Sequence, residues 1–178
     1  DGGEGVEVIV DRRLTNLAAL RVRGLDLSAE YALDTRYGAF SLSATASKMF
    51  AYESTLAPGA AAVSALDTIN GPVDFRGRAT LSWRGDHWGA GLSFNYTDDY
   101  RDTLSLPARR IDAFRSFDLR LTHAFASEPE RGAAIALNVL NLFDADPPFV
   151  NNPTGYAFDA SNASPLGRVV SLELRQRW

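Results

Sequence analysis

The apolar residues of this chain recur at every second position in one segment after another. Between Leu25 and Leu33, apolar side chains occupy the odd-numbered positions, and polar residues or alanine lie between them. A period of two is typical of a β-strand, because successive side chains point to opposite faces of the sheet. The alternation recurs in the segments 25–33, 40–47, 78–84, 90–97, 117–125, 133–139 and 170–178, and more weakly at 6–10. We therefore predict an all-β fold of about eight antiparallel strands.

The connections between these segments alternate in length. Short connections occupy 34–38, 85–86 and 127–132, whereas long ones occupy 55–73, 98–112 and 144–165. In an antiparallel meander, alternate connections lie at the same end of the sheet. Tight turns at one end and long loops at the other are typical of an outer-membrane β-barrel, where the turns are periplasmic and the loops extracellular.

Aromatic residues gather near both ends of the predicted strands. Those near the short turns are Tyr37, Phe40, Trp83, Trp88, Phe125 and Trp178. Those near the long loops are Phe50, Tyr52, Tyr96, Tyr100, Phe114, Phe117 and Phe143. Two aromatic girdles are expected of a membrane barrel, because amphipathic rings prefer the level of the lipid headgroups.

Charged residues share the second face of the strands with serine and threonine. They are Asp26, Glu30, Arg78, Arg84, Asp118, Arg120, Glu173, Arg175 and Arg177. In a membrane barrel this face lines the lumen and the apolar face meets lipid, whereas a soluble barrel reverses the two roles. Alternation alone does not choose between them. A last strand that runs to Trp178 without a polar tail favours the membrane barrel.

Composition excludes several other classes of protein. The chain of 178 residues is 46% hydrophobic and 22% charged, which is typical of a folded chain. It has no cysteine, which excludes disulfides, cysteine-bound zinc and thiol nucleophiles, and its formal net charge of −4 disfavours a nucleic-acid partner. No apolar run is long enough for a transmembrane helix. The chain opens at Asp1 without a signal peptide, so we expect a piece of a longer protein.

The C-terminal region carries a resemblance to a known family. The run Asn-Val-Leu-Asn-Leu-Phe-Asp at 138–144 resembles the penultimate-strand signature of TonB-dependent outer-membrane receptors. The similarity continues through the Asn- and Pro-rich stretch that follows it to the aromatic end at Trp178. Weaker likeness lies in Asn16-Leu17-Ala18, in 22–27 and in 76–79.

The resemblance implies active import across the outer membrane of a Gram-negative bacterium. The family's receptors are barrels of 22 strands with a plugged lumen. Residues 1–178 would then form the C-terminal part of such a barrel, without the plug domain. The implied partners are outer-membrane lipid, the plug domain, and TonB acting through the N-terminal part. The implied substrate is a ferric siderophore or another scarce nutrient.

The last strand also resembles the signal that the barrel-assembly machinery reads. Such signals end in an aromatic residue preceded by apolar residues at alternate positions, and the matching residues here are Val170, Leu172, Leu174 and Trp178. Gln176 departs from that pattern.

Ligand contacts are expected on the long loops. Candidates by location are Tyr100, Arg101, Arg109, Arg110, Phe149, Asn151, Asn152 and Tyr156, because aromatic and arginine side chains can meet an anionic chelate or a sugar. We predict no catalytic residues, no cofactor and no metal site, because His87 and His123 lack a nucleophile at a recognisable spacing.

Two alternatives to the receptor interpretation remain. One is a self-contained eight-stranded outer-membrane barrel with a structural, adhesive or enzymatic role. The other is a soluble ligand-binding barrel of the lipocalin type, which would place its apolar face inside. Detergent would separate them, because only the soluble barrel should be monodisperse in buffer.

Overall fold

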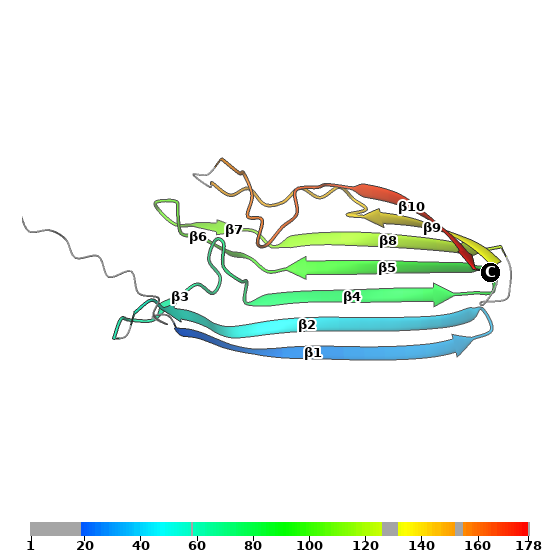
Figure 1. Ribbon diagram of the computed structural model, residues 1–178, viewed down its shortest axis with the longest axis horizontal. Coiled ribbons are helices and arrows are strands. Elements are labelled where there is room, and N and C mark those ends of the chain that lie inside the picture. Colours follow the sequence, from blue (N-terminus) through cyan, green and yellow to red (C-terminus); the bar gives the residue numbers. More distant parts are fainter. Residues whose placement is uncertain (1–18, 58, 126–131, 152–154, 178) are drawn as a thin grey trace, which may run out of the picture.

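The computed structural model describes residues 19–57, 59–125, 132–151 and 155–177, and these residues form β-strands without a helix (Figure 1). The strands are β1 (Ala19–Thr35), β2 (Gly38–Thr55), β3 (Val63–Ser64), β4 (Phe75–Arg84), β5 (Trp88–Thr97), β6 (Tyr100–Asp102), β7 (Arg109–Ile111), β8 (Phe114–Ala124), β9 (Gly132–Leu140) and β10 (Val169–Arg177). Within the described ranges, no helix is long and apolar enough to cross a bilayer.

The strands build one large antiparallel sheet. Its order is β1-β2-β4-β5-β8-β9-β10, with the short β3 paired to β2 as the eighth strand, while β6 and β7 form a separate hairpin. Each long strand thus pairs with the next long strand along the chain. The all-β antiparallel prediction is confirmed. The described sheet is open, with β1 and β10 at its edges, so closure into a barrel stays a prediction.

The connections that the structure describes segregate to the two ends as the sequence predicts, whereas the predicted short connection 127–132 lies outside the described residues except for Gly132, which begins β9. Arg36 and Tyr37 form the turn between β1 and β2, and residues 85–87 form the turn between β4 and β5, one residue longer than predicted. The amide of Gly85 donates to the carbonyl of Trp88 at 2.8 Å and closes that turn. The connections 56–74, 98–113 and 141–168 all lie at the opposite end (Figure 1). We refer to these ends as the short-turn end and the long-loop end.

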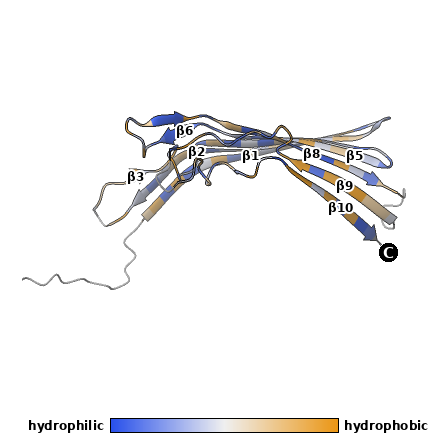
Figure 2. Cartoon of the chain, turned by 90° about the horizontal axis from the view of Figure 1, so that it is seen from above, coloured by the Kyte–Doolittle hydropathy of each residue, from blue (hydrophilic) through white to orange (hydrophobic). Residues whose placement is uncertain are grey.

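Register aligns the apolar side chains into rows that cross the sheet. One row pairs its members strand by strand from β1 to β10: Tyr31, Leu42, Leu81, Leu92, Leu119, Val139 and Val170. We call the side that carries this row the apolar face. The adjacent row lies on the other side, the polar face, and contains Glu30, Ser43, Thr80, Ser93 and Asp118. Figure 2 shows the resulting alternation of hydrophobic and hydrophilic bands along the strands.

Most large side chains of the apolar face are exposed, although Val139 in its central row is buried. On β5, the side chain of Ser93 is 6% exposed, whereas its neighbour Leu92 is 41% exposed. Leu81 in the same apolar row is 51% exposed and Tyr31 is 65% exposed. Within the described residues, no second layer covers the apolar face. A continuous apolar surface of this kind marks contact with another apolar phase or partner.

The only buried apolar cluster in the described part of the chain lies among the long loops. This loop core consists of Ile69, Val73, Tyr100, Ile111 and Val150. Its members come from three different connections, and the backbone links them: the amide of Ile69 donates to the carbonyl of Arg101, and the amide of Arg101 donates to the carbonyl of Asp67, both at 2.9 Å. The long loops therefore form a folded unit at one end of the sheet.

Some elements differ from the sequence prediction. β1 and β2 extend beyond the alternating segments toward the long-loop end. Their pairing shifts register between Arg23 and Gly24, so that Phe50 on β2 has no paired residue on β1. The short strands β3, β6 and β7 were predicted as loop. The weak segment at 6–10 and the likeness at Asn16-Leu17-Ala18 lie outside the described residues.

Candidate functional site

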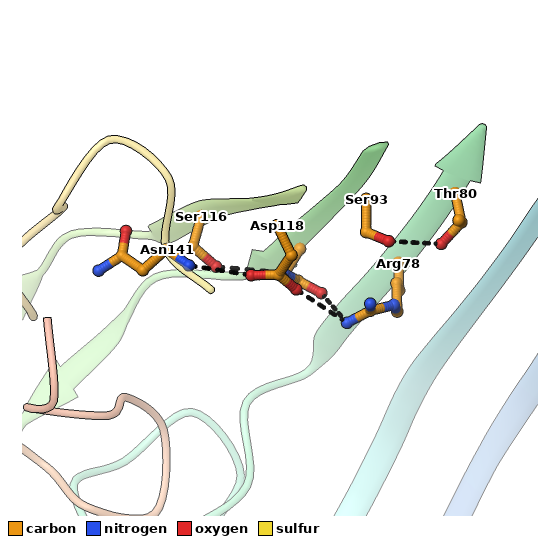
Figure 3. A network of polar contacts seen from close by, with 7 residues as sticks. Arg78, Thr80, Ser93, Ser116, Asp118 and Asn141 are labelled. Atoms are coloured by element: carbon orange, nitrogen blue, oxygen red, sulfur yellow. Dashed lines mark hydrogen bonds and ion pairs between the residues drawn. The ribbon is translucent and has the colours of Figure 1, made fainter. Parts of the chain in front are cut away.

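A network of polar side chains crosses the polar face around Asp118 on β8 (Figure 3). Its carboxylate accepts hydrogen bonds from the side-chain amide of Asn95 at 2.9 Å and from the guanidinium of Arg78 at 3.3 Å. Arg78 also donates to the side-chain oxygen of Asn95 at 2.6 Å, and that residue donates to Ser116 at 3.2 Å. The three strands β4, β5 and β8 are thereby linked on one side.

A second polar group lies on β8, β9 and β10. Arg120 donates to the side chain of Asn138 and forms an ion pair with Glu173 at 3.1 Å. Glu173 also accepts from Arg175. Because Arg120, Asn138 and Ser171 occupy one row of the register, the ladder extends the polar face to the last strand.

The Asn-Leu-Phe-Asp sequence ends β9 in a tight turn that contacts the first of these groups. Asn141 and Asp144 adopt positive φ angles of 50° and 57°. The side chain of Asn141 both donates to and accepts from the backbone of Ala145 at 2.9 Å, and the backbone amide of Asn141 donates to the carboxylate of Asp118 at 3.1 Å. The carboxylate of Asp144 accepts from the amide of Arg168 at 2.6 Å, just before β10 begins. The motif thus fixes where the last strand starts.

Two hollows lie on the polar face near the long-loop end. A shallow groove of about 510 Å³ runs over β1, β2, β4 and β5, and its polar lining includes Asp26, Ser28, Ser47, Arg76, Arg78 and Asn95. The second hollow, of about 560 Å³, shares Arg76, Asn95 and Thr97 with the first and is bounded by the loop segment 158–165. Hydroxyl, amide and guanidinium groups of this kind suit a polar solute.

The long loops are anchored onto this end of the polar face. Arg76 donates to the carbonyl of Ser161 at 2.9 Å and to the side chain of Asn162. The side-chain amide of Asn162 in turn donates to the carbonyl of Gly71 at 3.0 Å, and the carboxylate of Asp159 accepts from the backbone amide of Asn70 at 3.0 Å. Both Asp159 and Asn162 are buried. The loop between β9 and β10 is therefore held over the groove.

The predicted ligand-contact residues fall into two groups. Tyr100 belongs to the loop core and is 3% exposed, and burial, followed by the nearby Asp159 carboxylate, raises the pKa of its hydroxyl. The exposed group is Arg101, Arg109, Arg110, Phe149, Asn151 and Tyr156. Asn152 lies outside the described residues. A role in ligand contact stays a prediction for all of them.

The exposed candidates are already engaged with other loop residues. Arg110 makes two hydrogen bonds to Asp99 at 2.8 and 2.9 Å, which lower the pKa of that carboxyl. The guanidinium of Arg109 lies 5.6 Å from the ring centre of Phe149. Of the predicted assembly signal, Val170, Leu172 and Leu174 are exposed on β10, and Trp178 lies outside the described residues.

Sequence reasoning missed the residues that hold the loops together. Asp102, on β6, is 1% exposed, and its carboxylate accepts from Ser105 Oγ at 2.7 Å and from the amides of Leu104 and Ser105 at 3.0 and 3.2 Å. Burial alone would raise its pKa. The hydrogen bonds outweigh that effect and hold the pKa of this carboxyl below its ordinary value.

Acid should therefore loosen the loop around Asp102. A folded-state pKa below the unfolded value stabilises the loop at higher pH, and this contribution is lost as pH falls below about 4. We expect amide hydrogen exchange in 100–111 to accelerate more than in the strands when pH falls from 6 to 3, after correction for intrinsic rates. D102N should lose most of this response. An equal response in D102N would contradict the assignment.

The described residues of the polar face and the loops offer hydrogen-bonding and charged groups. Among them, no group of three or more His, Asp or Glu side chains is placed to hold a metal ion. His87 and His123 lie with their ring centres 6.4 Å apart, beside Trp88 at the short-turn end. That position is far along the sheet from the groove and the loop core.

Comparison with known proteins adds no relative to this description. No family model, no curated protein and no solved structure matches the chain.

Proposed function

We propose that this chain is a wall segment of an outer-membrane β-barrel that belongs to a TonB-dependent uptake receptor. One observation carries the membrane part of the proposal: the apolar face is continuous across seven strands, and most of its large side chains are exposed. Lipid is the natural cover for the apolar face, and a wet lumen suits the polar face.

The uptake part of the proposal rests on the resemblance in the C-terminal region. The turn at 141–144 gives that motif a structural role, because Asn141 and Asp144 tie the end of β9 to Asp118 and to the start of β10. The groove and the loops held above it supply a polar binding surface at the extracellular end. A ferric siderophore or another scarce nutrient is the proposed cargo.

Site-directed spin labelling tests the membrane wall. The chain contains no cysteine, so one introduced cysteine gives a unique label in it. Ser41 and Leu42 are adjacent on β2 and face opposite sides. In the purified, membrane-reconstituted protein, a label at L42C should collide with oxygen dissolved in lipid, and a label at S41C with a water-soluble nickel chelate. A label at L42C that neither reagent reaches would indicate a protein cover and contradict the proposal.

The native size of the polypeptide tests the receptor assignment separately. An antibody raised against the 144–165 loop would be used to blot the outer-membrane fraction. A band several-fold heavier than the 19.4 kDa of this chain would support the receptor. A band near that mass would replace it with a small autonomous barrel.

A further inference from the structure

Basic side chains gather where the apolar face ends on its long-loop side. We call this group the outer rim; it consists of Arg21, Arg23, Lys48 and Arg115. The extra residue at the register shift, Phe50, lies on β2, so alternation continues along β1 and places Arg21 and Arg23 on the same side as Leu25. On β2, Lys48 pairs with Leu25, and on β8, Arg115 pairs with Tyr96 of the apolar face. The outer rim therefore faces outward, away from the groove.

The height of the outer rim matches the headgroup layer of a bilayer. The apolar run on β1 from Leu25 to Leu33 spans roughly 27 Å at about 3.4 Å per residue. The apolar band of a membrane barrel is about 25 Å tall. Because barrel strands are tilted, the height of this run along the membrane normal is smaller than its length along the strand. Arg23 and Arg21 thus continue the strand directly above the hydrocarbon layer.

The short-turn end of the apolar face has a different chemistry. Its outward strand positions in the described residues carry Trp83, Trp88 and His123 in place of Lys or Arg. Arg36 lies in the turn itself, with its guanidinium 4.6 Å from the ring centre of Tyr37. The outward basic residues on the strands are therefore concentrated at the long-loop end.

Carboxylates only partly neutralise the outer rim. Arg21 lies 3.7 Å from Glu53 with its side chain 64% exposed, and Lys48 pairs with Asp74. Arg115 lies over the ring of Tyr96, with 5.5 Å between the guanidinium and the ring centre. Arg23 is exposed and forms no ion pair within the described ranges. At least two guanidinium groups are thus available to an anion.

We propose that the outer rim binds the phosphate groups of outer-leaflet lipid headgroups. Guanidinium groups bind phosphate oxygens in a bidentate manner, and basic side chains at a membrane surface attract anionic headgroups. The aromatic ring of Tyr96 lies beside them at the interface, where such rings prefer to be. This proposal rests on the membrane-wall part of the proposed function and adds a lipid partner of defined chemistry.

Retention of a phosphorylated lipid by the purified, detergent-solubilised protein tests this proposal. The probe is bisphosphorylated lipid A, the comparison lipid is its dephosphorylated form, and native mass spectrometry counts bound lipid. The double variant R21Q/R23Q should weaken binding of the bisphosphorylated form on the order of tenfold. R36Q/R84Q, which removes two exposed charges at the short-turn end, is the matched control and should bind as the wild type does.

The outcomes separate this inference from the proposed function. Equal binding by R21Q/R23Q and the control, or equal binding of both lipid forms by the wild type, would overturn the outer rim as a phosphate site while the spin-label pattern on β2 stood unchanged. If R21Q/R23Q does not assemble, a salt titration of the wild-type protein tests the same proposal. Its preference for the phosphorylated lipid should decline as the salt concentration rises to roughly 0.5 M, because salt screens partly exposed charges. A salt-independent preference would also overturn it.

Discussion

Replacing Leu81 with arginine should strongly reduce the amount of assembled protein in the outer membrane. Leu81 occupies the central row of the apolar face, between Leu42 on β2 and Leu92 on β5, and it is 51% exposed. An arginine on the lipid side of a barrel near the bilayer midplane costs about 2–4 kcal/mol. The measurement is the yield of the heat-modifiable folded form in outer-membrane fractions.

The adjacent residue supplies the matched control. Ser82 lies on the polar face, where it pairs with Ser41 and with Gly91, which has no side chain to obstruct a larger group. S82R should retain most of the folded form, because its guanidinium would meet water and hydroxyl groups. Equal losses in L81R and S82R would contradict a lipid-facing apolar side.

Removing the carboxylate of Asp118 should have the second largest effect. D118A would leave the guanidinium of Arg78, the side-chain amide of Asn95 and the backbone amide of Asn141 without their shared acceptor. Leaving donors unsatisfied in a partly buried site costs about 1–3 kcal/mol, and more when a charge is involved. We expect a loss of about 2–3 kcal/mol, measured as a lower unfolding temperature in detergent.

Asp26 offers a control on the same face. Its carboxylate accepts a hydrogen bond from Ser47 on the neighbouring strand, and the residue is exposed. D26A should change the unfolding temperature little, because water can replace the carboxylate. A loss in D26A as large as that in D118A would show that general surface charge, not the network around Asp118, sets stability.

The long strands were predictable because their signal is local. Each carries an alternation that requires no knowledge of its neighbours, and the seven long strands of the sheet coincide with the seven stronger segments. The ends of β1 and β2 were harder to place. Arg23 and Gly24 sit at a register shift, and a bulge of this kind interrupts the pattern on which a sequence prediction depends.

The loop core was not predictable, because its signal is not local. Ile69, Tyr100 and Val150 are isolated apolar residues in stretches without periodicity, and they meet only through contacts across long sequence separations. The sequence marked Tyr100 as a ligand-contact candidate because of its location in a loop. Its burial depends on a cluster with Ile69 and Val150 from the other long connections, which no spacing rule could have identified.

The network around Asp118 was partly predictable. The sequence placed Arg78 and Asp118 on one face, but pairing them required the register of β4, β5 and β8. The motif at 138–144 was recognised by resemblance. Its contacts with Asp118 and Arg168 explain the choice of Asn141 and Asp144, both of which adopt left-handed backbone angles that asparagine and aspartate tolerate.

The contact between Asp144 and Arg168 makes the pairing of β9 with β10 independent of the length of the loop between them. Because the pairing of β9 with β10 begins beside this contact, a residue inserted next to the exposed Tyr156 would leave that pairing in register, while Val150 and Asn162 keep their buried contacts. Each doubling of a flexible loop costs only about 0.6 kcal/mol of closure entropy. The exposed segment around Tyr156 can therefore vary in sequence while the strand pairing beside it stays constant.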